Sequence, residues 1–344
     1  MQEVSTINLY AKIAELIQTA RNETIRAVNQ TMVRSYFEIG RIIVEDEQQG
    51  ATRAEYGKKV LRELSGKLSN EFGKGFSVDN LQNMRQFFLV YGKYEKPSRI
   101  SKKNAIESQS HAFKLSWSHY LKLMRIADAQ ERAFYEIESS QNNWTLRELQ
   151  RQFDSALYQR LALSRDKDGV KRLSETGQIV EKPLDVLKDP YVLEFLCLPE
   201  RSGYSENDLE SEIIGNLEQF LLELGKGFAF VGRQVRFTFD ERHFRVDLVF
   251  FNRLLKCFVL IDLKIGELTH QDIGQMQMYV NYYDRFVKLA DENKTVGILL
   301  CRDKSNAIVE ITLPENNEQL FASSYKTVLP EKAELIKLLK QSEI

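Results

Sequence analysis

Three charged residues interrupt two apolar segments of the chain, in places where an ordinary hydrophobic core would exclude them. The stretch RVDLVFFNRLLKCFVLIDLKIG, residues 245–266, reads as two apolar strands joined by a short turn. Asp247 lies in the first strand, and Asp262 and Lys264 lie in the second. A charge buried without a partner costs several kcal/mol or more. These residue types therefore indicate a site with chemistry rather than a packed hairpin.

The spacing suggests what that chemistry is. If the hairpin folds about Leu254 and Leu255, Asp247 and Asp262 face each other, with Cβ atoms about 4.5–5.5 Å apart. Two carboxylates so placed repel each other unless a cation lies between them. Mg²⁺ or Mn²⁺ suits this position, because both ions prefer oxygen ligands and keep bound waters. Lys264 follows Asp262 by two residues and so shares its face of the strand. Such a site can bind a scissile phosphate and activate water.

A simpler reading is that these are surface charges at the edge of a sheet. The neighbouring residues argue against it, because Phe250, Phe251, Val259, Leu260 and Ile261 are all strongly apolar.

Two further polar residues lie close to the hairpin in the sequence. Glu210 falls near the middle of the apolar stripe of a helix predicted at residues 209–225. It can line the site, although an acid at a helix N-terminus is also favoured by the helix dipole. Gln275 lies one turn before Tyr279 on a helix predicted at residues 272–290. It can orient water or hold a phosphate, although a glutamine there is also an ordinary helix residue.

The elements that must position these residues follow one another in a definite order. After the helix at 209–225, apolar segments predict strands at 228–240, 244–251 and 256–265. The helix at 272–290 follows, and then a buried strand at 295–301. The order is α-β-β-β-α-β, with a further strand expected near Tyr325 and a last helix from Glu331.

The first half of the chain is predicted to be helical. Apolar periodicity predicts helices at about residues 9–17, 26–46 and 56–73, and another that begins after Ser77 as its N-cap. A helix, a glycine-containing turn and a second helix are typical of a helix-turn-helix. A plain helical hairpin with a solvated face fits the same pattern. The side chains that could contact phosphates or base edges are those of Lys74, Asn80, Asn83 and Arg85.

Composition limits the remaining possibilities. The chain has 344 residues, 43% hydrophobic and 28% charged, with a net charge of −1, so affinity for a polyanion must come from local patches. Three cysteines fit a reducing cytoplasm better than a disulfide framework. No apolar run has membrane-spanning length. We expect a cytoplasmic protein without a membrane partner. It would have a helical domain at 1–165, a polar linker at 166–190 and a second domain at 191–344.

The motifs together resemble a known superfamily. The strand Asp247, the Asp262-Leu263-Lys264 triplet and the Gln275-xxx-Tyr279 pair resemble the PD-(D/E)XK nucleases. The stretches FLLELGKGFAFVGRQ, DLVFFNRLLKCFVLIDLKIG and GQMQMYVNYYD look like the bacterial YhcG-type nucleases of that superfamily. The segment LSNEFGKGFSVDNLQNMRQFF resembles the helical domain of the same family, for which DNA binding is expected.

The resemblance implies roles for individual residues. Asp247, Asp262 and the backbone carbonyl of Leu263 would bind the metal ion. Lys264 would orient water or stabilise the transition state, and Glu210 and Gln275 would complete the site. Two positions depart from the superfamily pattern. Val246 replaces a nominal proline, and Asp262 replaces the commoner glutamate, which shortens the ligand but keeps its chemistry.

We therefore expect an α+β protein: an all-helical, helix-turn-helix-like N-terminal domain followed by a restriction-endonuclease-like α/β domain. The expected activity is Mg²⁺- or Mn²⁺-dependent hydrolysis of phosphodiester bonds, with DNA favoured as substrate by the resemblance. Two alternatives remain open: a catalytically silent scaffold or DNA-binding component of a restriction or mobile-element complex, and an RNA-directed nuclease. A homodimer would supply two active sites for duplex cleavage.

Overall fold

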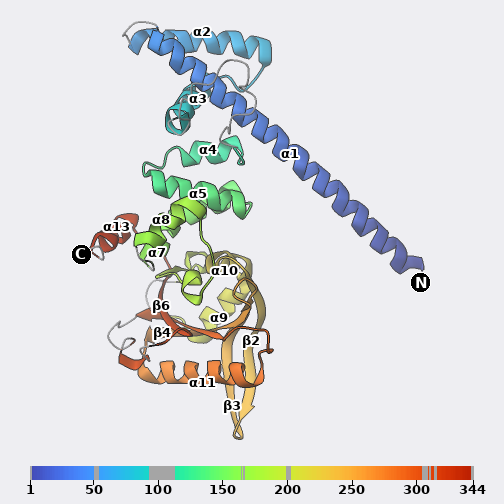
Figure 1. Cartoon of the computed structure of the whole chain (residues 1–344), viewed down its shortest axis with the longest axis vertical. Helices are drawn as coiled ribbons and strands as arrows, with labels where there is room; N and C mark the ends of the chain where they lie inside the picture. Colours follow the sequence, from blue (N-terminus) through green and yellow to red (C-terminus); the bar gives the residue numbers. More distant parts are fainter. Residues whose placement is uncertain are drawn as a thin grey trace. The chain divides into compact units, whose positions relative to one another are not determined.

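The chain forms two compact units, residues 1–150 and 151–344 (Figure 1). In this computed structural model the described residues are 2–49, 54–92, 113–163, 165, 167–198, 203–303, 309, 311–313 and 316–341. The boundary between the two units, after Gln150, precedes the linker expected at residues 166–190. That linker stays a prediction. No helix in the described ranges combines the length and the apolar character needed to cross a membrane.

The first unit is helical, as predicted. Its helices are α1 (Gln2–Gln49), α2 (Ala54–Phe72), α3 (Val78–Tyr91), α4 (Trp117–Leu123) and α5 (Ala129–Gln141), and α6 (Leu146–Asp154) begins in it. The expectation of separate helices at 9–17 and 26–46 is wrong, because α1 is continuous over 48 residues. Residues 18–25 contain neither glycine nor proline, so no residue in this stretch interrupts the backbone hydrogen bonds.

Helix α3 forms the centre of the first unit. Ser77 caps it as predicted, accepting a hydrogen bond from the Asn80 backbone N–H. The buried face of α3 includes Phe87, whose ring packs against Phe113 and Tyr120 at centroid distances of 5.0 and 5.1 Å. Aromatic contacts of this kind fix α3 firmly in the helical core.

The second unit carries a six-stranded sheet in the order β1-β6-β5-β4-β3-β2. Strands β2, β3 and β4 are antiparallel, whereas β4, β5, β6 and β1 run parallel. The strands are β1 (Tyr191–Val192), β2 (Phe228–Phe239), β3 (Arg242–Asn252), β4 (Cys257–Glu267), β5 (Val296–Asp303) and β6 (Leu320–Lys326). The helices are α7 (Leu157–Leu163), α8 (Lys167–Thr176), α9 (Glu206–Gly215), α10 (Leu217–Leu224), α11 (His270–Phe286) and α13 (Lys332–Gln341). Two short 3₁₀ turns lie at Pro183–Val186 and Glu194–Leu196.

The predicted α-β-β-β-α-β core is present, with one correction. The single helix expected at 209–225 is two helices, because Asn216 leaves helical geometry (φ −119°, ψ 36°) and separates α9 from α10. As predicted, Gly225 ends α10, with a positive φ of 101°.

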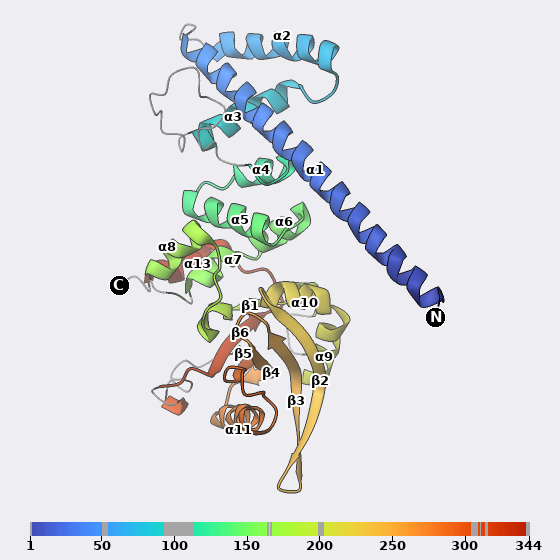
Figure 2. The same cartoon turned by 45° about the vertical axis from the view of Figure 1, so that its right-hand side comes forward.

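Helices cover both faces of the sheet (Figure 2). One apolar cluster joins Leu209 and Ile213 of α9 and Phe220 of α10 to the strands, and another joins Met276 and Val280 of α11 to the opposite face. This two-sided burial explains why β4 and β5 read as nearly continuous apolar runs.

A buried ion pair ties α7 to α10. Arg160 and Glu223 pair through their side chains and both are fully buried. Glu223 also accepts a 2.9 Å hydrogen bond from the Val192 backbone N–H. Glu223 is one of the buried residues of α10, the helix that follows the break at Asn216. Glu223 therefore has a structural partner and lies outside the candidate site.

Candidate active site

The site lies where β3 and β4 separate. The turn after Asn252 brings Cys257 opposite it, and paired residues continue to Leu248 and Ile261. The next position in this register sets Asp247 against Asp262. There the ladder stops, and the Leu263 backbone N–H donates a 2.8 Å hydrogen bond to Asp247 Oδ2 instead of to a carbonyl. The hairpin register expected from the sequence is confirmed, and the opening of the strands is an additional feature.

Asp262 is buried and strongly perturbed. Its side chain is 5% exposed, and burial, followed by the nearby charge of Asp247, raises its pKa to about 7. Lys264 Nζ lies 2.7 Å from Asp262 Oδ2 and opposes this rise. Burial lowers the pKa of Lys264, but Asp262, Glu206 and Asp247 together raise it above its ordinary value. The three residues singled out from the sequence therefore form one electrostatic unit.

A fourth residue, Gln234 of β2, connects the hairpin to α9. Gln234 Nε2 donates hydrogen bonds to Glu210 Oε2 and, at 3.1 Å, to Asp247 Oδ1. Glu210 is 5% exposed, so it reaches the site through this bridge. Gln234 has a positive φ of 47°, which is rare for a residue other than glycine and often marks a functional position. Sequence reasoning missed Gln234; its only signal is a polar residue within an apolar strand.

Gln275 lies beside the site on α11. Its Nε2 donates a hydrogen bond to the Tyr279 hydroxyl. Tyr279 is buried, and burial raises its pKa, with smaller contributions from Asp262 and Asp247. Tyr279 is therefore within electrostatic reach of both carboxylates, and the hydrogen bond to its hydroxyl is the side-chain contact that connects Gln275 with this region.

The donor set suits a hard divalent cation. Asp262 Oδ2 is buried and makes no well-directed hydrogen bond, although Lys264 Nζ is close enough for an ion pair. A carboxylate oxygen in that position, next to a second carboxylate, favours a positive ligand. Among the described residues no three His, Cys, Asp or Glu side chains group as a metal site. Asp247 and Asp262 would therefore need backbone or water oxygens to complete a coordination shell.

The residues expected to contact DNA lie in the first unit, and two of them have intramolecular partners. Asn80 Nδ2 donates to the Gly75 carbonyl at 2.6 Å, and Asn80 Oδ1 accepts from Trp117 Nε1 at 2.9 Å. Arg85 Nε lies 2.7 Å from Glu47 Oε2. Lys74 is exposed in the turn before α3, and Asn83 is half-buried.

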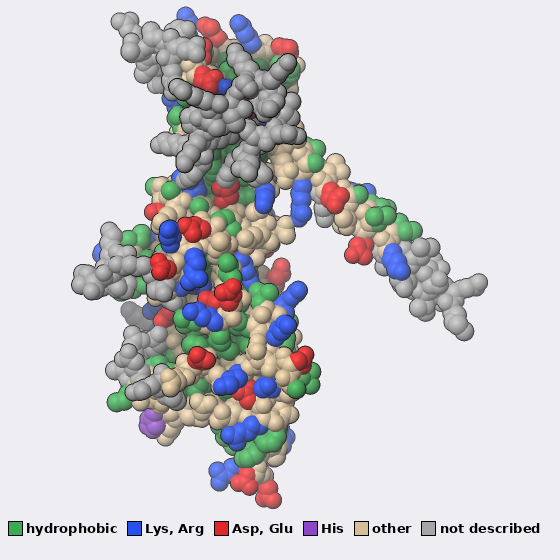
Figure 3. Space-filling view, viewed as in Figure 1, with side chains coloured by type: hydrophobic (Ala, Val, Ile, Leu, Met, Phe, Trp, Pro, Cys, Tyr) green, Lys and Arg blue, Asp and Glu red, His purple; other side chains and the backbone are tan. Residues whose placement is uncertain are grey.

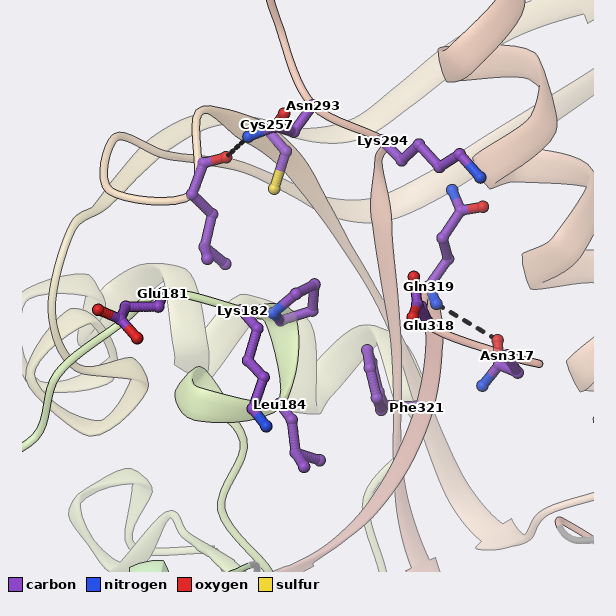
Figure 4. A pocket seen from close by; sticks show the side chains of 12 residues that line it. Glu181, Lys182, Leu184, Cys257, Asn293, Lys294, Asn317, Glu318, Gln319 and Phe321 are labelled. Carbon is purple, nitrogen blue, oxygen red and sulfur yellow. Dashed lines mark hydrogen bonds between the residues drawn. The ribbon is translucent and has the colours of Figure 1, made fainter. Parts of the chain in front are cut away.

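A cavity of about 550 Å³ lies at the opposite ends of the strands (Figure 4). Its lining includes Leu255 and Cys257 at the start of β4, and Phe321 of β6. Asp262 follows Cys257 by five residues, which is about 17 Å along a strand. This cavity is therefore separate from the carboxylate site.

Comparison with known proteins gives matches over most of the chain. Residues 12–160 match the family described as the DUF1016 N-terminal domain, and residues 184–340 match the YhcG PDDEXK nuclease domain. The chain is 39% identical over 341 residues to "Putative nuclease YhcG" of Escherichia coli (strain K12), covering 94% of this chain and 90% of that protein.

Solved structures give more distant likenesses. A repair endonuclease from Pyrococcus abyssi matches at 18% identity and a TM-score of 0.26, over 38% of this chain and 50% of that chain. EndoMS in a complex with double-stranded DNA matches at 16% identity and a TM-score of 0.27, over 39% of this chain and 49% of that chain. Both matches span only about half of the other chain.

Proposed function

This chain belongs to the YhcG family of PDDEXK nucleases, and from that premise we propose that it hydrolyses phosphodiester bonds in DNA with the help of Mg²⁺ or Mn²⁺. The observation that carries the proposal is the grouping of Asp247, Asp262 and Lys264 at the point where β3 and β4 separate. Asp262 is buried and Asp247 and Lys264 are half-buried beside apolar strands. Two close carboxylates and a lysine are suited to phosphoryl transfer, and without a ligand their burial would only destabilise the fold.

Asp247 and Asp262 would hold the cation, with the Leu263 carbonyl as a backbone ligand. When bound, the ion supplies a Lewis acid that polarises the phosphate and lowers the pKa of water. The Leu263 N–H and Gln234 hold the Asp247 carboxylate through both of its oxygens. This leaves Asp247 fixed in direction, so that its remaining lone pairs meet a ligand without reorganisation.

Lys264 has a different role in the proposal. Its ammonium group stays protonated beside Asp262. It can therefore hold the attacking water or donate to a phosphate oxygen on which negative charge develops. Glu210 acts through Gln234, which it keeps oriented toward Asp247. Gln275 would contact water or a phosphate from α11.

The helical unit would add affinity for DNA. We place this role on the turn and helix from Lys74 to Arg85, where Lys74 is exposed. The ion pair of Arg85 with Glu47 must open for Arg85 to reach a phosphate. The double variant Lys74→Ala with Arg85→Ala should weaken duplex binding by the full chain and leave Mn²⁺ binding unchanged. Unchanged duplex affinity would remove the proposed DNA-binding role of these residues, and loss of self-association with unchanged duplex affinity would favour assembly as a homodimer.

The activity is tested by incubating the purified chain with supercoiled plasmid, linear duplex DNA and RNA. Each substrate is used with Mg²⁺, with Mn²⁺ and with a chelator. Cleavage of DNA that requires the ion is the expected result. Cleavage of RNA alone would change the substrate class. Absence of cleavage with every substrate would favour a silent scaffold.

A further inference from the structure

We propose that the hairpin of β2 and β3 binds the phosphate backbone of DNA next to the active site, through the paired arginines Arg236 and Arg245. This inference rests on the proposed nuclease function and extends it to how the substrate is held. In Figures 1 and 2 the two strands reach past α11 as a long projecting hairpin.

The register sets the two arginines side by side. Arg236 pairs with Arg245, between the pairs Val235–Val246 and Phe237–Phe244. Those two flanking pairs pack into the apolar cluster on the α11 side of the sheet. Because side chains alternate along a strand, Arg236 and Arg245 point to the other face. Both are exposed.

Asp247 is linked to that other face through Gln234, whereas Asp262, between Ile261 and Leu263, lies toward α11. Glu210 lies on α9, which covers the face opposite α11, and it shares Gln234 with Asp247. Arg236 follows Gln234 by two residues, and Arg245 precedes Asp247 by two. Two residues span about 6.8 Å of a strand, or about two nucleotide steps along a duplex axis. A strand cleaved beside Asp247 would thus place a neighbouring phosphate against the arginine pair.

The paired arginines destabilise the protein in the absence of a ligand. Like charges directly opposite each other in an antiparallel pair destabilise it. No described residue forms an ion pair with Arg236, Arg245 or their neighbours Arg233 and Arg242. By contrast, Arg41, Arg85, Arg151 and Arg160 all have acidic partners. The paired arginines of the hairpin thus have no acidic partner among the described residues, and guanidinium groups bind phosphate through paired hydrogen bonds.

The acidic turn at the far end of the hairpin limits where the DNA backbone can bind. Asp240 and Glu241 form the turn, both at positive φ and both exposed. Figure 3 shows blue side chains over the hairpin and red ones at its tip. The acidic turn would repel a phosphate, so we place the bound backbone between the tip and Asp247.

The test compares full-length variants. Arg236→Ala with Arg245→Ala removes the pair, and Arg236→Lys with Arg245→Lys keeps the charge. Arg172→Ala with Arg253→Ala is the matched control, because both arginines are exposed and lie away from this hairpin face. Binding of a short fluorescein-labelled DNA duplex is followed by anisotropy in a chelator at several salt concentrations. Mn²⁺ binding, plasmid cleavage and the melting temperature are measured alongside.

The alanine pair should weaken duplex binding by about tenfold or more and reduce the slope of log K against log salt by about 2, since each phosphate contact contributes about 0.9. Its melting temperature should stay level or rise, because a repulsive pair is removed. The lysine pair should retain most of the affinity, and the control should match the wild type.

Two other outcomes overturn the inference in distinguishable ways. If the wild type cleaves DNA and the alanine pair binds and cleaves equally well, the hairpin is no substrate track and the proposed function survives. If the wild type binds Mn²⁺ but neither binds nor cleaves nucleic acid, the proposed function fails and the inference fails with it.

Discussion

The Leu263 backbone N–H donates its hydrogen bond to the Asp247 carboxylate, 2.8 Å away on the neighbouring strand. A side chain thus takes the place of a carbonyl at the point where the ladder between β3 and β4 ends. The consequence is that Asp247 is positioned by the strand that also carries Asp262 and Lys264. The two carboxylates cannot move apart without breaking this contact, so their mutual repulsion is built into the fold.

Replacing Lys264 should separate chemistry from metal binding. Lys264→Ala removes the ammonium group 2.7 Å from Asp262 and should lower the cleavage rate by about 100-fold or more, as loss of a transition-state donor does. Mn²⁺ binding by calorimetry should be retained, because the carboxylates remain. Lys171→Ala, an exposed lysine on α8, is the control. Cleavage at the wild-type rate by Lys264→Ala would remove the assigned role.

Gln234 should act as a positioning residue. Gln234→Ala leaves Glu210 buried without the amide donor that it has in the wild type, which costs about 1–3 kcal/mol of unfolding free energy. Mn²⁺ affinity should fall, because Asp247 loses one of two hydrogen bonds. Gln234→Glu should lower stability further, since it places a third carboxylate between those of Glu210 and Asp247.

The matched control is Gln277→Ala, on α11, whose amide bonds only Asn281 on the exposed surface. Urea denaturation and calorimetry are the two measurements. If Gln234→Ala matches Gln277→Ala in both, the bridge has no role in holding Asp247.

The contribution of Asp262 to stability should decline as pH rises in the absence of divalent metal. The folded pKa of Asp262 is about 7, against an ordinary 3.8. The unfolded chain therefore loses this proton near pH 4, while the folded chain keeps it to about pH 7. Asp262 therefore holds its proton more tightly in the folded state, so the contribution of Asp262 to the unfolding free energy is greatest below pH 4 and falls as pH rises to about 7.

Asp262→Asn should remove this contribution and flatten the profile between pH 4 and 7. Mn²⁺ should restore stability to the wild type above pH 7 and have no such effect on Asp262→Asn. Identical pH profiles for the two proteins in a chelator would show that Asp262 is not perturbed in this way.

The buried pair Arg160–Glu223 should matter for stability alone. Arg160→Met removes the nearest cation of the fully buried Glu223 carboxylate and leaves only Arg151, at 3.6 Å, as an ion-pair partner, so it should cost about 3–5 kcal/mol of unfolding free energy. Adding Glu223→Gln should recover part of that loss, because the neutral side chain can still accept from the Val192 N–H. Urea denaturation gives both values. If the loss of unfolding free energy in the double variant equals the sum of the losses in the two single variants, the two charges do not interact.

Much of this organisation follows from the sequence, for identifiable reasons. Apolar alternation and length fix β2 to β4 and α11, and the short turn after Asn252 leaves one register, which sets Asp247 against Asp262. The grouping with Lys264 then follows from strand alternation. A charge inside an apolar strand is a strong signal because its burial is costly.

The features that sequence reasoning missed have two kinds of cause. The helix boundaries have local signals, because residues 18–25 of α1 contain no glycine or proline, whereas Gly215 and Asn216 at the end of α9 are residues of low helix propensity. The other features depend on contacts between distant residues. Gln234, at a left-handed φ, bonds Glu210, which lies 24 residues earlier on another element. The burial of Glu223 depends on Arg160, which lies 63 residues earlier.

The most direct test of the central claim is a parallel titration of Mn²⁺ into the wild type, Asp247→Asn and Asp262→Asn. Calorimetry records binding, and plasmid cleavage is measured at each concentration. The wild type should bind the ion and cleave with the same concentration dependence, and each variant should lose both, because either aspartate alone is an incomplete ligand set. Wild-type binding and cleavage by either variant would contradict the assignment of this carboxylate pair as the metal-dependent nuclease site.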